Sequence, residues 1–290
     1  GRVLALVDLL ADDGTGLKLY STPNEDALQD ISLSLNNINM AELTSVMPYA
    51  PQLGGLLHGD LHYMQADSAT TISTDIGIRR MTYEGTPMGD MGLNAIYFPN
   101  TDGRHHVDAV VTQNDNEIAM LAGTYWEQNG EGQIDAEATL ESLPLSLANA
   151  FLPEGTIRLK GATSGSLTIT GRAANPLMTG SLATEGVHVL AEDYSVDLSI
   201  PDDTLRVNNS YLDLDRIEAY AAGKSPLTID GSINFSDLDN IRLSLDLAAK
   251  KYKLIDAPQS HTALAYGKVY VDMNARAWGT LNDLKVRGRL

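Results

Sequence analysis

Histidines are the first residues in this chain whose spacing could support chemistry. His58 and His62 stand four positions apart, the separation at which a helix places two imidazoles on one zinc ion. Their surroundings, GDLHYM at 59–64, alternate like a strand, and a strand would hold the two rings on one face about 13 Å apart. We therefore expect no metal site here. His105 and His106 follow a turn and should point to opposite faces at the start of a strand.

Paired carboxylates are the second possibility. Asp213 and Asp215 share one face of a strand pattern, and two carboxylates on one face can act as the acid and base of a glycosidase. The chain has 38 Asp and Glu, so such pairs arise by chance on a solvated face. The sequence contains no phosphate loop, nucleophile elbow or dinucleotide fingerprint. It predicts no catalytic residue, no cofactor and no enzyme activity.

The composition of the chain limits the classes of partner that it is expected to bind. The 290 residues have a net charge of −18, and only 20 are Lys or Arg. Nucleic acid and anionic membranes attract basic segments, so this chain should be repelled by both unless a local patch overrides the total. Cysteine is absent, which removes disulfides and thiolate sites and fits the cytosol or the periplasm. No apolar stretch reaches the roughly 20 residues of a membrane helix.

Both ends of the sequence resemble internal positions of a longer chain. Residues 1–16 show no signal-peptide pattern and begin as if inside a strand, and the last residues stop in a strand-like run. We expect a piece of a longer protein.

Hydrophobic alternation predicts the fold class. In IRLSLDLAA at 241–249, Leu243, Leu245 and Leu247 fall on one side and polar residues on the other, as in a strand with one apolar face. In the first half, Ile118, Met120, Ala122, Thr124 and Trp126 alternate in the same way. Turn residues at 99–104, 127–132 and 200–203 predict hairpins. The product is an antiparallel meander that is apolar on one face.

Two stretches break the strand rhythm. Residues 37–55 and 140–155 carry apolar residues at three- and four-residue spacing, which predicts short amphipathic helices near 40–48 and 144–152, each ended by Pro. A Gly-marked strand should follow each helix.

A degenerate repeat links the two halves. GRAANPLMTGSL at 171–182 and GTLNDLKVRGRL at 279–290 share Gly at the first and tenth positions and Leu at the last. Met40 to Leu145, Gly59 to Gly165 and Gly171 to Gly279 span 105, 106 and 108 positions. We predict a partial repeat at 1–38, helix-led repeats at 39–142 and 143–263, and the start of another at 264–290.

These residues resemble a known family. The frame GSLTITGRAANPLMTGSLATEGVHV at 165–189, and the cadence of GKVYVDMNARAWGTLNDLKVRGRL at 267–290, are similar to the C-terminal region of TamB proteins, the inner-membrane component of the translocation and assembly module. The second copy has Asp283-Leu284 in place of Asn175-Pro176. The resemblance covers residues 140–290, and it reaches residues 1–140 only through the repeat.

The resemblance implies a fold and a function. TamB proteins are related to the AsmA-like group and to bridge-like lipid transfer proteins built of repeating β-grooves. It implies a mainly β protein whose long, curved, largely antiparallel sheet forms an apolar groove, with short helices between repeats. It also implies a periplasmic location in a didermic bacterium, an inner-membrane anchor, phospholipid transport, outer-membrane protein assembly and a TamA/BamA-like outer-membrane barrel as partner.

The inward positions define a hypothetical lipid groove. They are mostly aliphatic, which suits flexible acyl chains better than flat rings. The predicted lining comprises Leu167, Ile169, Val196, Leu198, Ile200, Leu205, Val207, Leu212, Leu214, Leu227, Ile229, Ile233, Leu243, Leu245, Leu247, Val269, Val271 and Met273. From alternation alone, the same residues fit an ordinary β-sandwich core. The repeat and the resemblance favour the groove.

Three function classes remain open. The first is a TamB-like scaffold that shields acyl chains. The second is a surface adhesin or structural β-sandwich array, which the helix-led repeat disfavours. The third is a carbohydrate enzyme that uses Asp213 and Asp215. Only Trp126 and Trp278 are tryptophans, and both fall on strand patterns, so the sequence offers few platforms for sugar rings.

Overall fold

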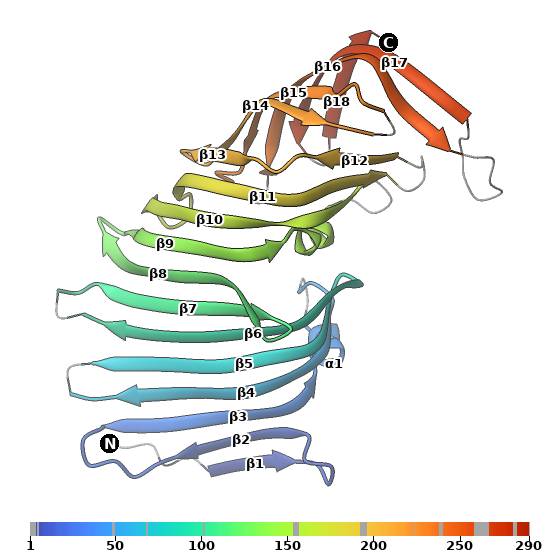
Figure 1. The fold of residues 1–290 in the computed structure, drawn as a ribbon. Helices are drawn as coiled ribbons and strands as arrows, with labels where there is room; N and C mark the ends of the chain where they lie inside the picture. Colours follow the sequence, from blue (N-terminus) through green and yellow to red (C-terminus); the bar gives the residue numbers. More distant parts are fainter. Residues whose placement is uncertain are drawn as a thin grey trace. The chain divides into compact units, whose positions relative to one another are not determined.

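A computed structural model describes most of the chain and divides it into two units, residues 1–141 and 142–290. The described residues are 4, 6–47, 50–67, 69–100, 102–152, 157–191, 196–221, 223–237, 240–257, 267–280 and 283–289. Among them are 18 strands and two short helices (Figure 1). Neighbouring strands pair in the antiparallel sense, and the described strands of each unit form an open sheet. The predicted mainly β, antiparallel fold is confirmed.

Unit 1 is a meander in which each strand pairs with the next along the chain. Its strands are β1 (Leu6–Leu10), β2 (Gly16–Ser21), β3 (Gln29–Asn39), β4 (Leu53–Gln65), β5 (Thr70–Tyr83), β6 (Thr86–Pro99), β7 (His105–Gln113), β8 (Asn116–Gln128) and β9 (Glu131–Pro144). The links at 99–104 and 127–132 join β6 to β7 and β8 to β9, as the turn residues predict.

Unit 2 is a second meander. Its strands are β10 (Arg158–Arg172), β11 (Leu177–Ala191), β12 (Val196–Ile200), β13 (Thr204–Asn208), β14 (Tyr211–Ala219), β15 (Leu227–Asn234), β16 (Arg242–Ala257), β17 (Gly267–Thr280) and β18 (Asp283–Arg289). The two glycine-framed segments of the sequence occupy similar places in it. Residues 171–182 run from the end of β10 into β11, and residues 279–290 run from the end of β17 into β18.

The turn prediction at 200–203 is wrong. β12 and β13 both pair with β11, and they run in the same direction along it, so they occupy one strand position in two pieces. The interruption serves a bulge in β11, because the Asp202 carboxylate accepts a hydrogen bond from the Gly186 backbone N–H at 2.8 Å. Pro201 has no N–H for a strand ladder, which explains why pairing stops there.

Both predicted helices are present. α1 (Met40–Ser45) begins at Asn39, whose side chain accepts from the Ala41 N–H and donates to Glu42. η1 (Leu145–Phe151) is a 3₁₀ helix, held to β10 by two hydrogen bonds between Asn149 and the Leu159 backbone. Pro48 and Pro153, predicted to end the helices, lie outside the described residues.

The apolar stripe predicted for α1 does not pack as a stripe. Met40 is buried, whereas Leu43, Val46 and Met47 are exposed. The six residues of α1 make fewer than two helical turns. Only Met40 is therefore buried, and the apolar residues that follow it remain exposed to solvent.

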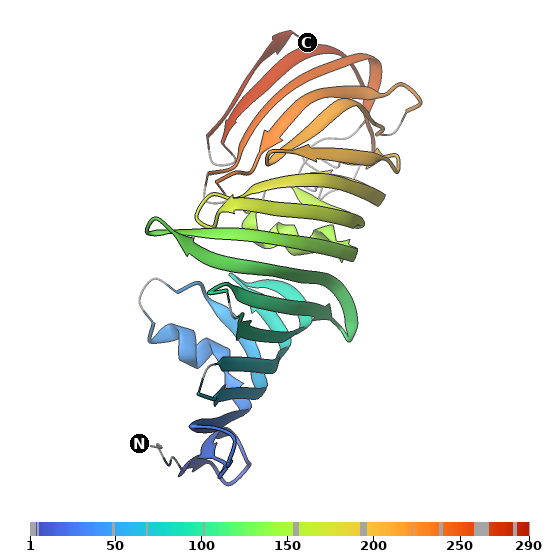
Figure 2. The ribbon, with the colours of Figure 1, turned by 90° about the vertical axis from the view of Figure 1, so that its left-hand side faces the viewer.

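Bulges bend the strands. In three strands a residue with positive φ is inserted at a bulge, so that two residues on the polar face stand opposite one residue of the next strand. These inserted residues are Arg80, Arg216 and Lys251. The backbone N–H of each donates to a carboxylate on the next strand, from Asp90, Asp230 and Asp272 respectively. An extra residue on one face bends a strand toward the other face. The strands curve along their length (Figures 1 and 2). Because the extra residues stand on the polar face, we infer that the apolar face lies inside the bend.

Candidate functional site

The apolar face of unit 2 contains all 18 residues of the predicted groove lining. The pairing register shows this directly. Val207 stands opposite Leu212, which stands opposite Ile233, which in turn stands opposite Leu243. Side chains opposite one another in neighbouring strands point to the same face. Sequence alternation therefore grouped these residues, which come from seven strands, on one surface.

Burial varies along this face. Val207 and Leu227 are buried, whereas Val269 is 38% exposed. Leu227 belongs to a packed cluster with Ala219, Ala249 and Tyr252, against which Leu198, Ile200, Ile229, Leu247 and Met273 pack. Part of the predicted lining is thus core of unit 2. The remaining lining residues are half-buried.

Tyr252 places a polar atom in this cluster. Its hydroxyl has no hydrogen-bond partner among the described residues, and the nearby Ala221 backbone lacks the geometry of a hydrogen bond. Burial raises the pKa of the Tyr252 hydroxyl. The neutral form is therefore held in an apolar setting.

Glycines shape the apolar face. Gly165 and Gly231 have φ of +152° and +139°, and a Cβ on either would lie 2.1 Å from a carbonyl oxygen of the neighbouring strand. Gly59 in unit 1 has the same property, with φ of +126° and the same distance of 2.1 Å. Only glycine permits this approach of two strands. The Gly59 and Gly165 landmarks of the sequence repeat are therefore structurally alike.

Unit 1 has an apolar face of the same kind, from which the predicted lining took no residue. The register aligns Leu33 with Leu61, and Ile76 with Leu93, so these side chains share a face. They are half-buried or, at Leu61, exposed. The signal was available in the sequence, because β3 to β7 alternate as regularly as the strands of unit 2.

In β8 the predicted phase is wrong. Ala119 and Leu121 pair with Val111 and Ala109 on the apolar face, and Gly123 and Tyr125 follow them. Met120, Ala122, Thr124 and Trp126, which the alternation favoured, lie on the opposite face. Both phases of β8 are largely apolar, so periodicity alone could not decide which one faces inward. Ile118 is buried beside a bulge.

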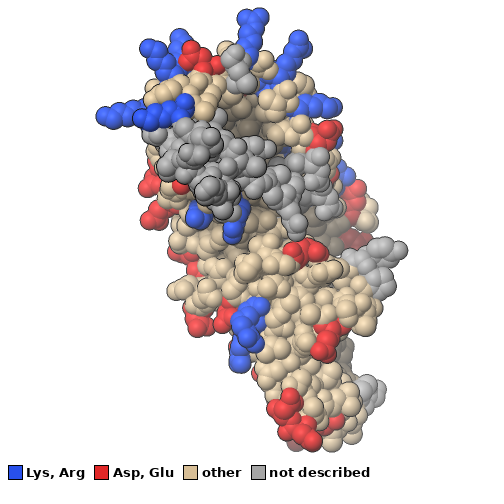
Figure 3. Space-filling model, turned by 90° about the vertical axis from the view of Figure 1, so that its right-hand side faces the viewer, with Lys and Arg blue, Asp and Glu red and all other residues tan. Residues whose placement is uncertain are grey.

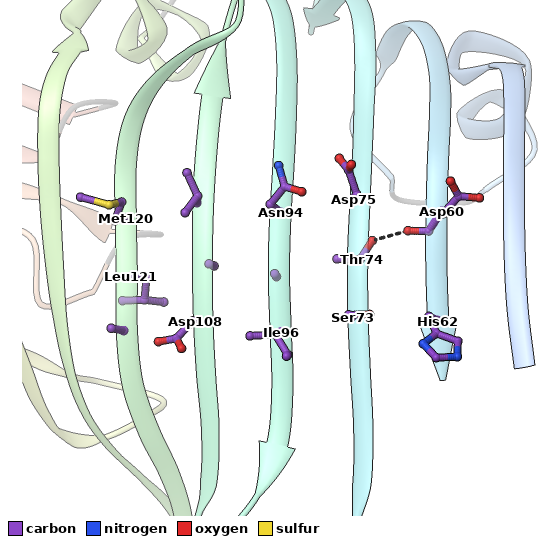
Figure 4. Close-up of a pocket in the computed structure, with 14 residues that line it drawn as sticks. Asp60, His62, Ser73, Thr74, Asp75, Asn94, Ile96, Asp108, Met120 and Leu121 are labelled. Atoms are coloured by element: carbon purple, nitrogen blue, oxygen red, sulfur yellow. Dashed lines mark hydrogen bonds between the residues drawn. The ribbon is translucent and has the colours of Figure 1, made fainter. Parts of the chain in front are cut away.

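A hollow of about 630 Å³ lies on the polar face of unit 1 (Figure 4). Ile96 and Met120 give it an apolar floor, and Asp60, Asp75 and Asp108 stand around it. The Thr74 hydroxyl donates to the backbone oxygen of Asp60 at 3.2 Å. The acids form no group of three suited to a metal ion among the described residues.

The histidines lie in separate environments. His58 and His62 are on the polar face of β4, and His62 Nε2 lies 2.9 Å from Asp30 Oδ1. Hydrogen bonds from Asn24 and then His62 lower the pKa of Asp30.

His105 and His106 lie on opposite faces of β7. The ring of His105 stacks on Tyr97, and His106 lies 3.1 Å from Asp108. The partners of His62, His105 and His106 are Asp and Tyr side chains, so none of these contacts places a Ser or Cys nucleophile beside an imidazole base.

The paired acids of β14 face solvent. Asp213 stands opposite Arg206 on the polar face, and Asp215, in the bulge, has a side chain that is 89% exposed. An exposed carboxylate beside Arg216 is not in the apolar environment that would make it a general acid.

Comparisons with family models, curated proteins and solved structures found no match to this chain. Within the described residues, no helix has both the length and the apolar character needed to span a bilayer.

Proposed function

We propose that this chain is a periplasmic segment of a TamB-like protein and that its apolar face shields lipid acyl chains. In this function it supports phospholipid transport to the outer membrane and protein assembly there. The proposed full-length protein is anchored in the inner membrane and works with a TamA/BamA-like barrel assembly protein.

The apolar face of unit 1 is the observation that carries the proposal. Leu33, Ile76 and Leu93 remain only half-buried, and Leu61 is 36% exposed. Strands of this unit contact their neighbours in the meander, and α1 contacts β3 and β4 at one end. A contiguous apolar surface of this kind usually binds something.

An acyl chain fits that surface energetically. Each buried methylene contributes about 0.8 kcal/mol, so a chain of roughly 16 carbons loses on the order of 12 kcal/mol when it enters water. Aliphatic side chains along an open sheet offset most of that loss and need no cofactor. Strand pairing satisfies backbone N–H and C=O groups along the sheet, so an acyl chain can lie on it without replacing those hydrogen bonds.

The test is a paired substitution in β16. Leu245 lies on the apolar face opposite Gly231 and Ala277, and Ala248 lies exposed on the polar face, opposite Thr228 and Asn274. Leu245→Asp places a charge on the acyl path, which costs several kcal/mol or forces the carboxyl to take up a proton. We expect loss of binding to a fluorescent long-chain fatty acid and loss of outer-membrane integrity in cells.

Ala248→Asp is the matched control in the same strand. It should change the free energy of unfolding by about 0.5 kcal/mol or less and leave binding intact. Circular dichroism separates loss of binding from loss of folding. Equal binding by both folded variants would contradict the groove, and so would purified protein from which mass spectrometry recovers no lipid. Unfolding of Leu245→Asp alone would assign Leu245 to a packed core, and Leu93→Asp would then carry the test in unit 1.

A further inference from the structure

The charge of this acidic chain reverses near its C-terminal end. Residues 1–241 contain 11 Lys and Arg against 34 Asp and Glu, whereas residues 242–290 contain nine against four. Figure 3 shows the Lys and Arg side chains gathered on the part of unit 2 formed by its last strands. The proposed acyl-chain groove is apolar, so it does not account for the excess of positive charge in residues 242–290.

The strand register places these cations on the polar face of β16, β17 and β18. Arg276 stands opposite Arg287, Asn274 opposite Arg289, and Trp278 opposite Lys285. The aliphatic side chains of the same strands, such as Leu243 and Val286, point the other way.

Two carboxylates balance part of this charge. Asp246 lies 4.0 Å from Arg276 Nε, and Asp283 lies 3.8 Å from Lys285 Nζ. Arg242, Arg287 and Arg289 have no hydrogen bond or ion pair with any described residue. Three guanidinium groups on one face are therefore available to an external anion.

A hollow of about 670 Å³ lies within this basic face. Arg242, Arg276 and Arg287 line it, together with Ser244 and Trp278. The Arg276 side chain donates to the Ser244 hydroxyl at 3.3 Å, which links two residues of the lining. Trp278 is 37% exposed, so its ring offers apolar surface beside the arginines.

We propose that this basic face of β16–β18 docks on a bilayer that contains anionic phospholipid, with a lipid phosphate entering the hollow. Guanidinium groups match phosphate oxygens in a bidentate geometry, and basic clusters are attracted to anionic lipid surfaces. Tryptophan favours the headgroup level of a membrane, where its ring is half in contact with apolar chains. The hollow supplies both contacts.

The acidic surface of a second copy is the other partner that charge complementarity allows. Carboxylates such as Asp60 and Asp75 stand on a sheet face, and two sheet faces in contact would leave the hollow unfilled and Trp278 against polar groups. A compact phosphate that projects from a bilayer enters the hollow directly. The lipid surface is therefore the better fit.

The experiment is flotation of the 290-residue protein with vesicles. We expect binding to phosphatidylcholine vesicles in which roughly a third of the lipid is phosphatidylglycerol, little binding to phosphatidylcholine alone, and loss of binding as salt rises. The double variant Arg242→Gln/Arg287→Gln should weaken binding roughly tenfold or more. Trp278→Ala should weaken it by a smaller factor.

Arg206→Gln/Arg216→Gln is the control. It removes the same charge from exposed positions on the polar face of the same unit, outside the hollow, and should bind like the wild type. The proposal is overturned by equal binding to both vesicle types, by equal loss in both double variants, or by unchanged binding of the Arg242/Arg287 variant. Displacement by free inorganic phosphate at the concentration of the lipid phosphate would point to a phosphate site instead and also overturn it.

Light scattering measures self-association and so distinguishes docking on a second copy of the chain from docking on a membrane. A salt-sensitive oligomer without vesicle binding would overturn membrane docking. The salt titration uses wild-type protein, so the test holds even if a variant folds poorly. Vesicle docking does not depend on the apolar groove, and Leu245→Asp should dock like the wild type. Failure of one proposal is thereby distinguished from failure of the other.

Discussion

Asp30 illustrates how single polar residues hold the meander of unit 1. Its carboxylate accepts hydrogen bonds from the side chain of Asn24 at 3.0 Å and lies 2.9 Å from His62. Only 12% of the Asp30 side chain is exposed, so these contacts are shielded better than those on the open sheet face. They join the link before β3 to the neighbouring β4.

The lowered pKa of Asp30 predicts an acid-side dependence of stability. A carboxyl whose pKa is lower in the folded than in the unfolded state stabilises the fold above the unfolded-state value of about 3.9, and that contribution is lost as pH falls through the folded value. Asp30→Asn should therefore be less stable than the wild type at neutral pH, and the difference should shrink below about pH 4. Urea denaturation at a series of pH values measures it.

Glu137→Gln serves as the comparison, because it removes an exposed carboxyl that stands opposite Ala122 and has no hydrogen-bond or ion-pair partner among the described residues. Its curve should follow that of the wild type. A constant difference between Asp30→Asn and the wild type across the acid range would show that Asp30 acts through shape and not through its charge.

At the scale of the strand, glycine decides how closely neighbours approach. Gly231 in β15 stands opposite Leu245, and its missing Cβ leaves room for the Ser244 carbonyl oxygen. Gly171, at the end of β10, also has positive φ, of +92°, but no atom would lie within 4 Å of an added Cβ. The two positions therefore separate backbone strain from steric contact.

Gly231→Ala should be strongly destabilising. Strain at positive φ and displacement of the β16 backbone each cost about 1–3 kcal/mol. Gly171→Ala carries the strain alone and should cost about 1 kcal/mol. Guanidinium denaturation of both variants measures the difference, and equal costs would mean that β15 and β16 separate without penalty.

The sequence predicts the strands well because alternation reports the two faces of a sheet directly. Alternation alone placed the predicted lining residues, from Leu167 in β10 to Met273 in β17, on one surface before the strand pairing was known. The prediction failed where alternation carries no information. Both phases of β8 are apolar, and the break at 201–203 has the turn residues of a hairpin although the chain continues along β11. The bulges depend on hydrogen bonds between strands, such as Arg216 to Asp230, which local sequence does not encode.

The basic face illustrates a different limit. Its cations are separated along the chain by apolar and polar residues, so no run of like charge marks them. Only the register of β16, β17 and β18 gathers them on one surface. The net charge of −18 hides that surface completely.

At the scale of the molecule, each unit combines an apolar face that is only partly self-covered with an outer face that carries the charge. Core packing is concentrated around Ala219, Leu227, Ala249 and Tyr252, whereas Leu61 in unit 1 remains exposed. A fold with so much partly exposed apolar surface gains stability from any occupant that binds the folded state and not the unfolded chain.

A single-chain lipid should therefore raise the unfolding midpoint of the delipidated protein. At a concentration one hundred times its Kd, a ligand stabilises by about 2.7 kcal/mol, which corresponds to a shift of about 5–10 °C for a domain of this size. Zwitterionic lysophosphatidylcholine below its micelle concentration is a suitable probe, because it tests the chain without engaging the basic face through net charge. Glycerophosphocholine, which has the same headgroup and no acyl chain, should leave the midpoint unchanged, and Leu245→Asp should reduce the shift. A shift of equal size with glycerophosphocholine would assign the effect to the headgroup, and a fall in the midpoint with the lysolipid would mean that the apolar face binds chains only as the protein unfolds.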